Sequence, residues 1–284
     1  MTTPNTERIY ASFKRQFATW CASEGRLAVP CSSDTLLAYM TYLIEQRALT
    51  PVSVNSHLAG IRSGQPTELA GLAEARTMLR EWQARWSKQG GRQQKALPAS
   101  AADVRAMVRT CSGFEPADLR DGTLLLLAWG TAAQAESLAR IEIRDLQVAS
   151  TGVTVSIPAT VDGKPSLGDA FLARDEDTSQ DPVFFVREWL SLLEEGGVTD
   201  GPLFKQINRH GTVLTAQGST LLGRDSLRSL VQRRAQRAGL ENWKKIGLQS
   251  LRTGSAVTRV DLTCDEDALA IHGHWRPASS IVGY

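Results

Sequence analysis

The sequence predicts a mainly α-helical protein of two domains with one small β-sheet. Long stretches place apolar residues at steps of three and four, which is the period of an amphipathic helix. One stretch, residues 152–158, instead has Val153, Val155 and Ile157 at every second position, which is typical of a strand. Residues 89–98 have no apolar period and contain two adjacent glycines and a proline, so they predict a linker. A chain of 284 residues can bury a core on each side of it.

The first domain, residues 1–88, is expected to hold four helices. Apolar residues over 6–23 lie on one stripe, and residues 32–34 supply hydroxyl and carboxylate caps for a second helix. Thr50 and Pro51 open a third helix, because proline is tolerated in a first turn. A fourth is predicted over residues 68–86, with Leu72, Leu79 and Trp82 on its inner side.

The second domain, residues 99–284, is expected to be helical around one hairpin. Residues 161–164 predict the hairpin turn, with Gly163 at a position that favours positive φ. The helices expected from apolar periodicity and caps are residues 103–111, 119–130, 136–141, 182–193, 223–238, 250–260 and 265–272.

Composition excludes several protein classes. No run approaches the roughly 18 apolar residues of a membrane span, and the N-terminus lacks the basic flank and apolar core of a secretory signal. The four cysteines lie far apart without a C-x-x-C pair, so we expect reduced thiols and neither a disulfide framework nor a zinc site. These features predict a cytoplasmic protein with no metal and no cofactor.

The distribution of charge says more than the net charge of +2. Residues 224–259 carry nine basic residues against two acids, and residues 76–95 form a second basic stretch. A single basic run is usually a solvated helix face. Two runs on separate domains favour a groove for a polyanion.

Three side chains near the end of the sequence could handle a phosphodiester. Arg252 offers a planar fork of donors for phosphate oxygens at the expected start of a helix, with Ser250 as its cap. Trp275, beside His274, offers an indole N–H donor. Tyr284 offers a hydroxyl that could form a phosphotyrosyl ester. Taken singly, each has an ordinary structural explanation, and only their joint spacing favours a reactive site.

That spacing resembles the tyrosine recombinases, the phage integrase family. Trp275 follows Arg252 by 23 residues and Tyr284 follows Trp275 by nine, which is similar to the Cre-like members, where tryptophan replaces the commoner histidine. Segments similar to the family also occur in order along the chain, at residues 39–43, 53–61, 95–98, 124–146, 201–204 and 231–240. The resemblance implies a helical, SAM-like core-binding domain followed by an α+β catalytic domain.

The resemblance implies catalytic roles for some residues of this sequence. Tyr284 matches the nucleophile, Arg252 the second of two phosphate-binding arginines, and Trp275 the last donor, with His274 next to it. The lysine of the family's hairpin, its usual general acid, falls on Thr160 or Val161, and Lys164 is the nearest lysine at the turn.

Other catalytic positions are substituted. The first arginine falls on Gln134, the acid three places later on Ser137, and the histidine before Arg252 on Gln249. With Thr160 at the lysine position, the pattern indicates a degenerate active site.

Contacts to DNA are expected from three places. The third helix would read the major groove, while the linker and the basic helix of the second domain would follow the backbone. The residues concerned are Ser53, Asn55, Ser56 and Arg62, then Arg92 and Lys95, then Arg224 and Arg228.

Three hypotheses remain open from the sequence. The chain is a site-specific recombinase, or a catalytically impaired recombinase-derived DNA-binding protein with a segregation, regulation or accessory role. The third is a helical protein-interaction module whose basic stretches meet acidic partners. The first two imply double-stranded DNA as partner, a homo-oligomer on DNA (dimer or tetramer), and association with the nucleoid.

Overall fold

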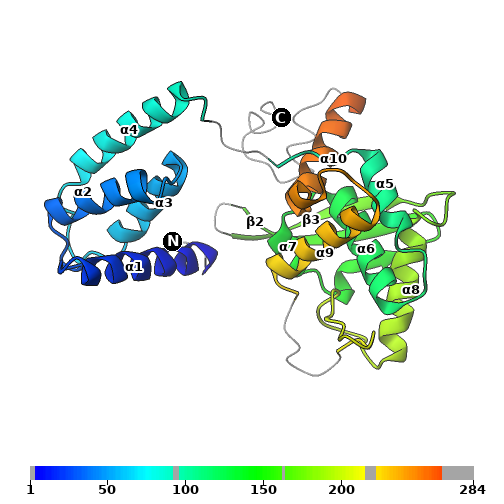
Figure 1. Cartoon of the computed structure of the whole chain (residues 1–284). Helices are drawn as coiled ribbons and strands as arrows, with labels where there is room; N and C mark the ends of the chain where they lie inside the picture. Colours follow the sequence, from blue (N-terminus) through cyan, green and yellow to red (C-terminus); the bar gives the residue numbers. More distant parts are fainter. Residues whose placement is uncertain (1–3, 92–95, 162–163, 215–221, 264–284) are drawn as a thin grey trace. The chain divides into compact units, whose positions relative to one another are not determined.

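A computed structural model describes residues 4–91, 96–161, 164–214 and 222–263. The chain divides into two compact units, residues 1–95 and 96–284 (Figure 1). Each unit has its own hydrophobic core. Among the described residues no helix is both long and apolar enough to cross a membrane.

The first unit is helical throughout its described part. Its elements are α1 (Pro4–Ser23), α2 (Ser33–Thr41), the π-helical turn η1 (Tyr42–Gln46), α3 (Pro51–Arg62) and α4 (Leu72–Lys88). The predicted caps are confirmed, since the hydroxyl of Ser32 accepts from the Thr35 N–H at 3.2 Å and that of Thr50 from the Ser53 N–H at 3.3 Å.

The fourth helix begins later than the sequence predicts. Gly71 precedes it in the left-handed conformation, with φ 75°, so the helix starts at Leu72 and not near residue 68. A side chain at Gly71 would overlap Ser33, which holds the start of α2 against this turn.

An aromatic cluster fills the core of the first unit. Phe17 and Tyr39 are almost fully buried, and the Tyr39 hydroxyl lies 3.2 Å from Nδ1 of the buried His57. The centroid of the Phe13 ring lies 4.1 Å from that of the His57 ring. Burial and, next, the charge of Arg47 lower the pKa of His57, so the imidazole is neutral and forms part of the core.

The second unit combines helices with one small sheet, as predicted. Its elements are α5 (Ala101–Arg109), α6 (Pro116–Thr131), α7 (Ala135–Ala139), the 3₁₀ turn η2 (Ile143–Asp145), β1 (Leu146–Val148), β2 (Gly152–Val161), β3 (Lys164–Ala173), α8 (Pro182–Glu195), α9 (Arg224–Arg237), the 3₁₀ turn η3 (Trp243–Lys245) and α10 (Leu248–Thr263). The helix expected over residues 265–272 lies outside the described residues.

The sheet is antiparallel in the order β1-β2-β3. The predicted hairpin is confirmed, because Val161 at the end of β2 pairs with Lys164 at the start of β3. Strand β1 was not predicted from the sequence; it is three residues long and pairs Leu146 with Val155.

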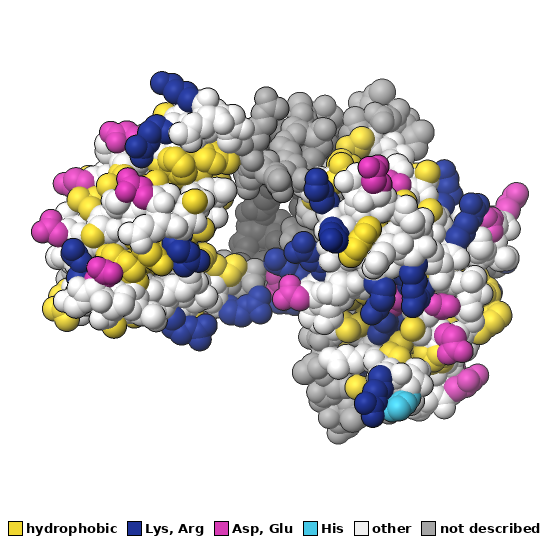
Figure 2. All heavy atoms as spheres, viewed as in Figure 1, with side chains coloured by type: hydrophobic (Ala, Val, Ile, Leu, Met, Phe, Trp, Pro, Cys, Tyr) yellow, Lys and Arg dark blue, Asp and Glu magenta, His cyan; other side chains and the backbone are white. Residues whose placement is uncertain are grey.

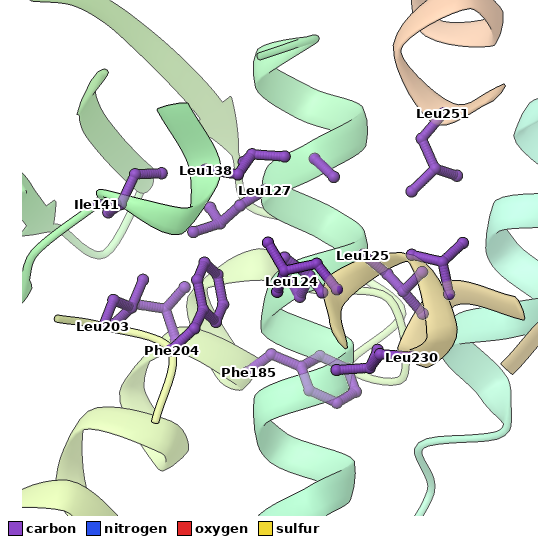
Figure 3. Packing of buried hydrophobic residues seen from close by; sticks show 14 of the residues in the cluster. Leu124, Leu125, Leu127, Leu138, Ile141, Phe185, Leu203, Phe204, Leu230 and Leu251 are labelled. Carbon is purple, nitrogen blue, oxygen red and sulfur yellow. The ribbon is translucent and has the colours of Figure 1, made fainter. Parts of the chain in front are cut away.

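Helix α6 is the centre of the second unit. It packs against α5, α8, α9, α10 and β3, so nearly its whole circumference is buried. Figure 3 shows side chains from neighbouring elements, among them Phe185, Leu230 and Leu251, converging on Leu124 and Leu125 of α6.

A buried ion network joins α9 to α6. Arg234 is 1% exposed and donates from Nε to Oδ2 of Asp121 at 2.7 Å and from Nη2 to Oδ1 of Asp118 at 2.8 Å. It also donates to the carbonyls of Thr110 and Ala117. Burial by itself would lower the pKa of Arg234, but the charge of Asp121 and the hydrogen bonds to Asp121 and Asp118 raise it above its ordinary value. This arginine of the basic run is therefore a core residue.

Candidate phosphodiester site

Arg252 is held inside the second unit near the start of α10. The helix begins at Leu248, so Arg252 lies in its second turn, where it is 7% exposed. Ser250 does not precede the helix as a cap but lies within its first turn. Its hydroxyl accepts from the Gly247 N–H at 3.2 Å and donates to the Lys245 carbonyl at 3.3 Å.

The guanidinium of Arg252 reaches the turn between α6 and α7. Its Nη1 donates to the backbone carbonyl of Ala132. Ala132 ends α6 in the left-handed conformation, with φ 49°, and so turns the chain sharply into α7. This hydrogen bond fixes the position of Arg252 relative to the residues that follow α6.

Gln134 lies in that same turn, two residues after Ala132. It is the N-cap residue of α7, it is exposed, and its side chain makes no capping hydrogen bond. The structure thus brings the Gln134 segment next to Arg252, which is the juxtaposition that the resemblance implies for the two arginines. Here the first of the two positions is a neutral amide.

Gln249 occupies the first turn of α10 and is exposed. Its Nε2 donates to the hydroxyl of the buried Thr253 at 3.3 Å, one turn further along the helix. Gln134, Gln249 and Arg252 therefore combine one guanidinium with two neutral amides, all of which are groups that can donate to an anion.

The beginning of α10 is anchored by the segment that leads into α5. The Ala99 N–H donates to the Ser250 carbonyl at 3.0 Å. A Cβ at Gly254 would overlap the carbonyl oxygen of Ala99, so the helix can approach this closely only because residue 254 is glycine.

The register of the hairpin places Thr160 opposite Pro165, and Lys164 at the first position of β3. Five other predicted site residues, Trp275, His274, Tyr284, Arg92 and Lys95, lie outside the described residues.

On α3, two of the four predicted base-reading side chains are engaged within the helix. The Ser56 hydroxyl donates to the Val52 carbonyl at 2.9 Å, and the Ser53 hydroxyl lies 3.0 Å from that of Thr50. Asn55 and Arg62 are exposed. Of the four, these two keep their donors available.

Helix α9 presents a basic surface of the second unit. Arg224 and Arg228 are exposed, and within the described residues neither side chain makes a hydrogen bond or an ion pair. Figure 2 shows Lys and Arg side chains gathered on the visible face of this unit, with acidic side chains among them. Arg228 lies against the start of α10, because its Cγ is 3.6 Å from the position of a Cβ on Gly247. Sequence reasoning had no means of finding this contact.

No family model matches the chain. The chain is similar to an integrase/recombinase XerD homolog of Selenomonas ruminantium, with 24% identity over 276 residues that cover 94% of this chain and 76% of the relative.

Two solved structures share the fold. One is the XerH site-specific recombinase bound to a palindromic difH substrate in a post-cleavage complex, with TM-score 0.52 and 15% identity over 97% of this chain and 91% of that one. The other is the Tn1549 transposon integrase in complex with transposon right end DNA, with TM-score 0.51 and 10% identity over 89% and 80%. The chain has the tyrosine recombinase fold, and the resemblance of its sequence to the tyrosine recombinase family is confirmed.

Proposed function

We propose that this chain, which has the tyrosine recombinase fold, binds double-stranded DNA and cuts and rejoins it through a phosphotyrosyl intermediate. The observation that carries this is the position of Arg252, whose guanidinium is fixed beside the Gln134 turn at the start of a helix. The DNA complexes in which both similar structures were solved support double-stranded DNA as the partner.

The chemistry assigns one role to each group. The Tyr284 hydroxyl gives up its proton to solvent water and attacks the phosphorus, the bond to one strand oxygen breaks, and the bond energy is kept in the phosphotyrosyl ester for rejoining. Arg252 and Trp275 donate to the phosphate oxygens, where negative charge grows in the transition state. Lys164 donates the proton that the leaving oxygen takes up.

A suicide substrate tests this proposal. A duplex nicked next to the cleavage position loses the short strand after attack, so the protein stays covalently attached. We expect a protease-sensitive shifted band with the wild-type chain and none with Tyr284→Phe. Duplex binding should remain in Tyr284→Phe, because the ring stays and only the hydroxyl is removed.

The second candidate function is a DNA-binding protein that keeps the recombinase fold without efficient cleavage. The neutral side chains of Gln134 and Gln249 favour it, because losing one preorganised donor typically costs about 3 kcal/mol, or 10²- to 10³-fold in rate. Such losses are not additive within one site. Salt-dependent duplex binding without any covalent band would favour this candidate. No salt-dependent duplex binding at all would favour a protein-interaction module instead.

A further inference from the structure

Arg228 stands where α9 meets the beginning of α10. Its Cγ packs beside Gly247, the residue before α10, so the rest of the side chain extends from that point. Gln249 is the second residue of α10, and Arg252 lies four residues after Leu248, about 6 Å further along the helix axis. An exposed arginine side chain of α9 thus starts beside the N-terminal end of α10, the helix that carries Arg252.

Helix α9, which carries Arg228, is also next to the Gln134 turn. Helix α9 packs against α7, which Gln134 begins, as well as against α10. The buried Leu227 precedes Arg228 and anchors this end of α9 in the core. Three elements that carry Gln134, Gln249 and Arg228 therefore meet at the beginning of α10: the α6–α7 turn, α10 itself and α9.

Charge distinguishes Arg228 from the other two groups. Gln134 and Gln249 are neutral, whereas a guanidinium is permanently positive and binds phosphate through two parallel N–H donors. Arg228 is exposed and, within the part of the chain that the structure describes, forms no ion pair that a phosphate would have to displace. Arg233 and Arg234, further along α9, are by contrast paired with Asp121.

We propose that Arg228 is a phosphate-binding residue of the same site as Arg252 and supplies the positive charge that Gln134 and Gln249 lack. The inference rests on the proposed binding of DNA but not on cleavage. This role differs from a contact to some other phosphate of the DNA backbone. When two arginines bind the same phosphate, the effect of losing one on DNA affinity depends on whether the other is present.

A double-mutant cycle on duplex binding tests it. Arg228→Gln and Arg252→Gln are each expected to weaken binding about 10- to 100-fold, the range for hydrogen bonds to charged groups. If both bind one phosphate, the double variant loses at least threefold less than the product of the single losses. Arg224→Gln is the matched control, one turn earlier on the same exposed face, and its effect should multiply with that of Arg252→Gln.

A second arm uses only exposed positions, since Arg252→Gln alters a buried residue and its fold must be checked by circular dichroism. Gln134→Arg restores a guanidinium to the site. We expect Gln134→Arg to recover most of the duplex affinity that Arg228→Gln loses. In the Arg224→Gln variant, Gln134→Arg should raise the duplex affinity by no more than it does in the wild type.

The outcomes separate the two proposals. The role of Arg228 would be overturned if the affinity losses multiplied in the Arg228/Arg252 cycle as they do in the Arg224/Arg252 cycle. It would also be overturned if Gln134→Arg raised the affinity equally in Arg228→Gln and in Arg224→Gln. Either result leaves DNA binding itself intact. Failure of the wild-type chain to bind duplex in low salt would remove the proposed function and this inference together. If Arg252→Gln does not fold, the Gln134→Arg arm decides alone.

Discussion

Replacing Arg234 by methionine should destabilise the second unit far more than any change to an exposed arginine of α9. Methionine keeps the length of the side chain but removes four hydrogen bonds, to Asp121, Asp118, Thr110 and Ala117. Asp121 is fully buried and would keep Arg120, at 2.8 Å, and the more distant Arg233, at 3.9 Å. Removing one partner of a buried ion pair typically costs about 3–5 kcal/mol, because it leaves an uncompensated charge.

Native-state hydrogen exchange is the suitable measurement, because a chain of two units need not unfold in one step. Peptides from α6 and α9 report opening of the second unit, and peptides from α1 and α3 serve as an internal reference. The expected loss of stability corresponds to amide exchange that is more than about a hundredfold faster in α6 and α9.

Arg233→Met is the matched control for this experiment. Arg233 is the neighbouring residue, but its side chain is 52% exposed and its Nη2 lies 3.9 Å from Asp121, so its contribution is about 0–1 kcal/mol. If exchange in Arg234→Met were no faster than in Arg233→Met, the assignment of Arg234 to the core would be wrong.

Two further predictions concern the anchoring of α10 and the core of the first unit. Gly254→Ala should lower the stability of the second unit by about 1–3 kcal/mol or more, because the new Cβ overlaps a backbone carbonyl. In the control Gly223→Ala the new Cβ enters open space, so no such loss is expected. Thermal unfolding of both variants checks this. Acid should destabilise the first unit, because burial lowers the pKa of His57 below its ordinary 6.5 and the unfolded chain binds the proton more readily. Stability is therefore complete above pH 6.5 and falls as the pH drops below that value. Hydrogen exchange of α1 and α3 at pH 5 and 7 should show this in the wild type and lose most of it in His57→Gln.

The helices of this chain could be predicted wherever a local cap and an apolar stripe agree. Ser32 and Thr50 each precede a predicted helix, and the side-chain oxygen of each accepts from a backbone N–H three residues later. The start of α4 could not be predicted in the same way. It depends on the left-handed conformation of Gly71 and on its close approach to Ser33, which lies on another helix.

The basic run after residue 224 shows what a charge count leaves out. Arg228 and Arg234 look equivalent in the sequence, yet Arg228 is exposed and Arg234 is buried, with 1% of its surface exposed. The difference is decided by Asp121, whose carboxylate meets Arg234 across 113 residues of sequence. No local pattern reports such a partner. For the same reason the spacing of Arg252 and Gln134 implied their proximity only through the family resemblance, and the bond to Ala132 gives that proximity a physical basis.

The arrangement around Arg252 also bears on how strongly salt should affect binding. A second guanidinium at position 134 would lie beside a buried one, and like charges at short range oppose each other when no phosphate is present. Arg228 keeps its charge in solvent until DNA arrives, which avoids this repulsion in the free protein. An exposed charge is screened within about 8 Å at physiological ionic strength. The contribution of Arg228 should therefore fall steeply as salt is added, whereas that of the buried Arg252 should change less. Measuring the salt slope of duplex binding for Arg228→Gln against Arg252→Gln compares the two directly, and equal slopes would argue against this division of charge.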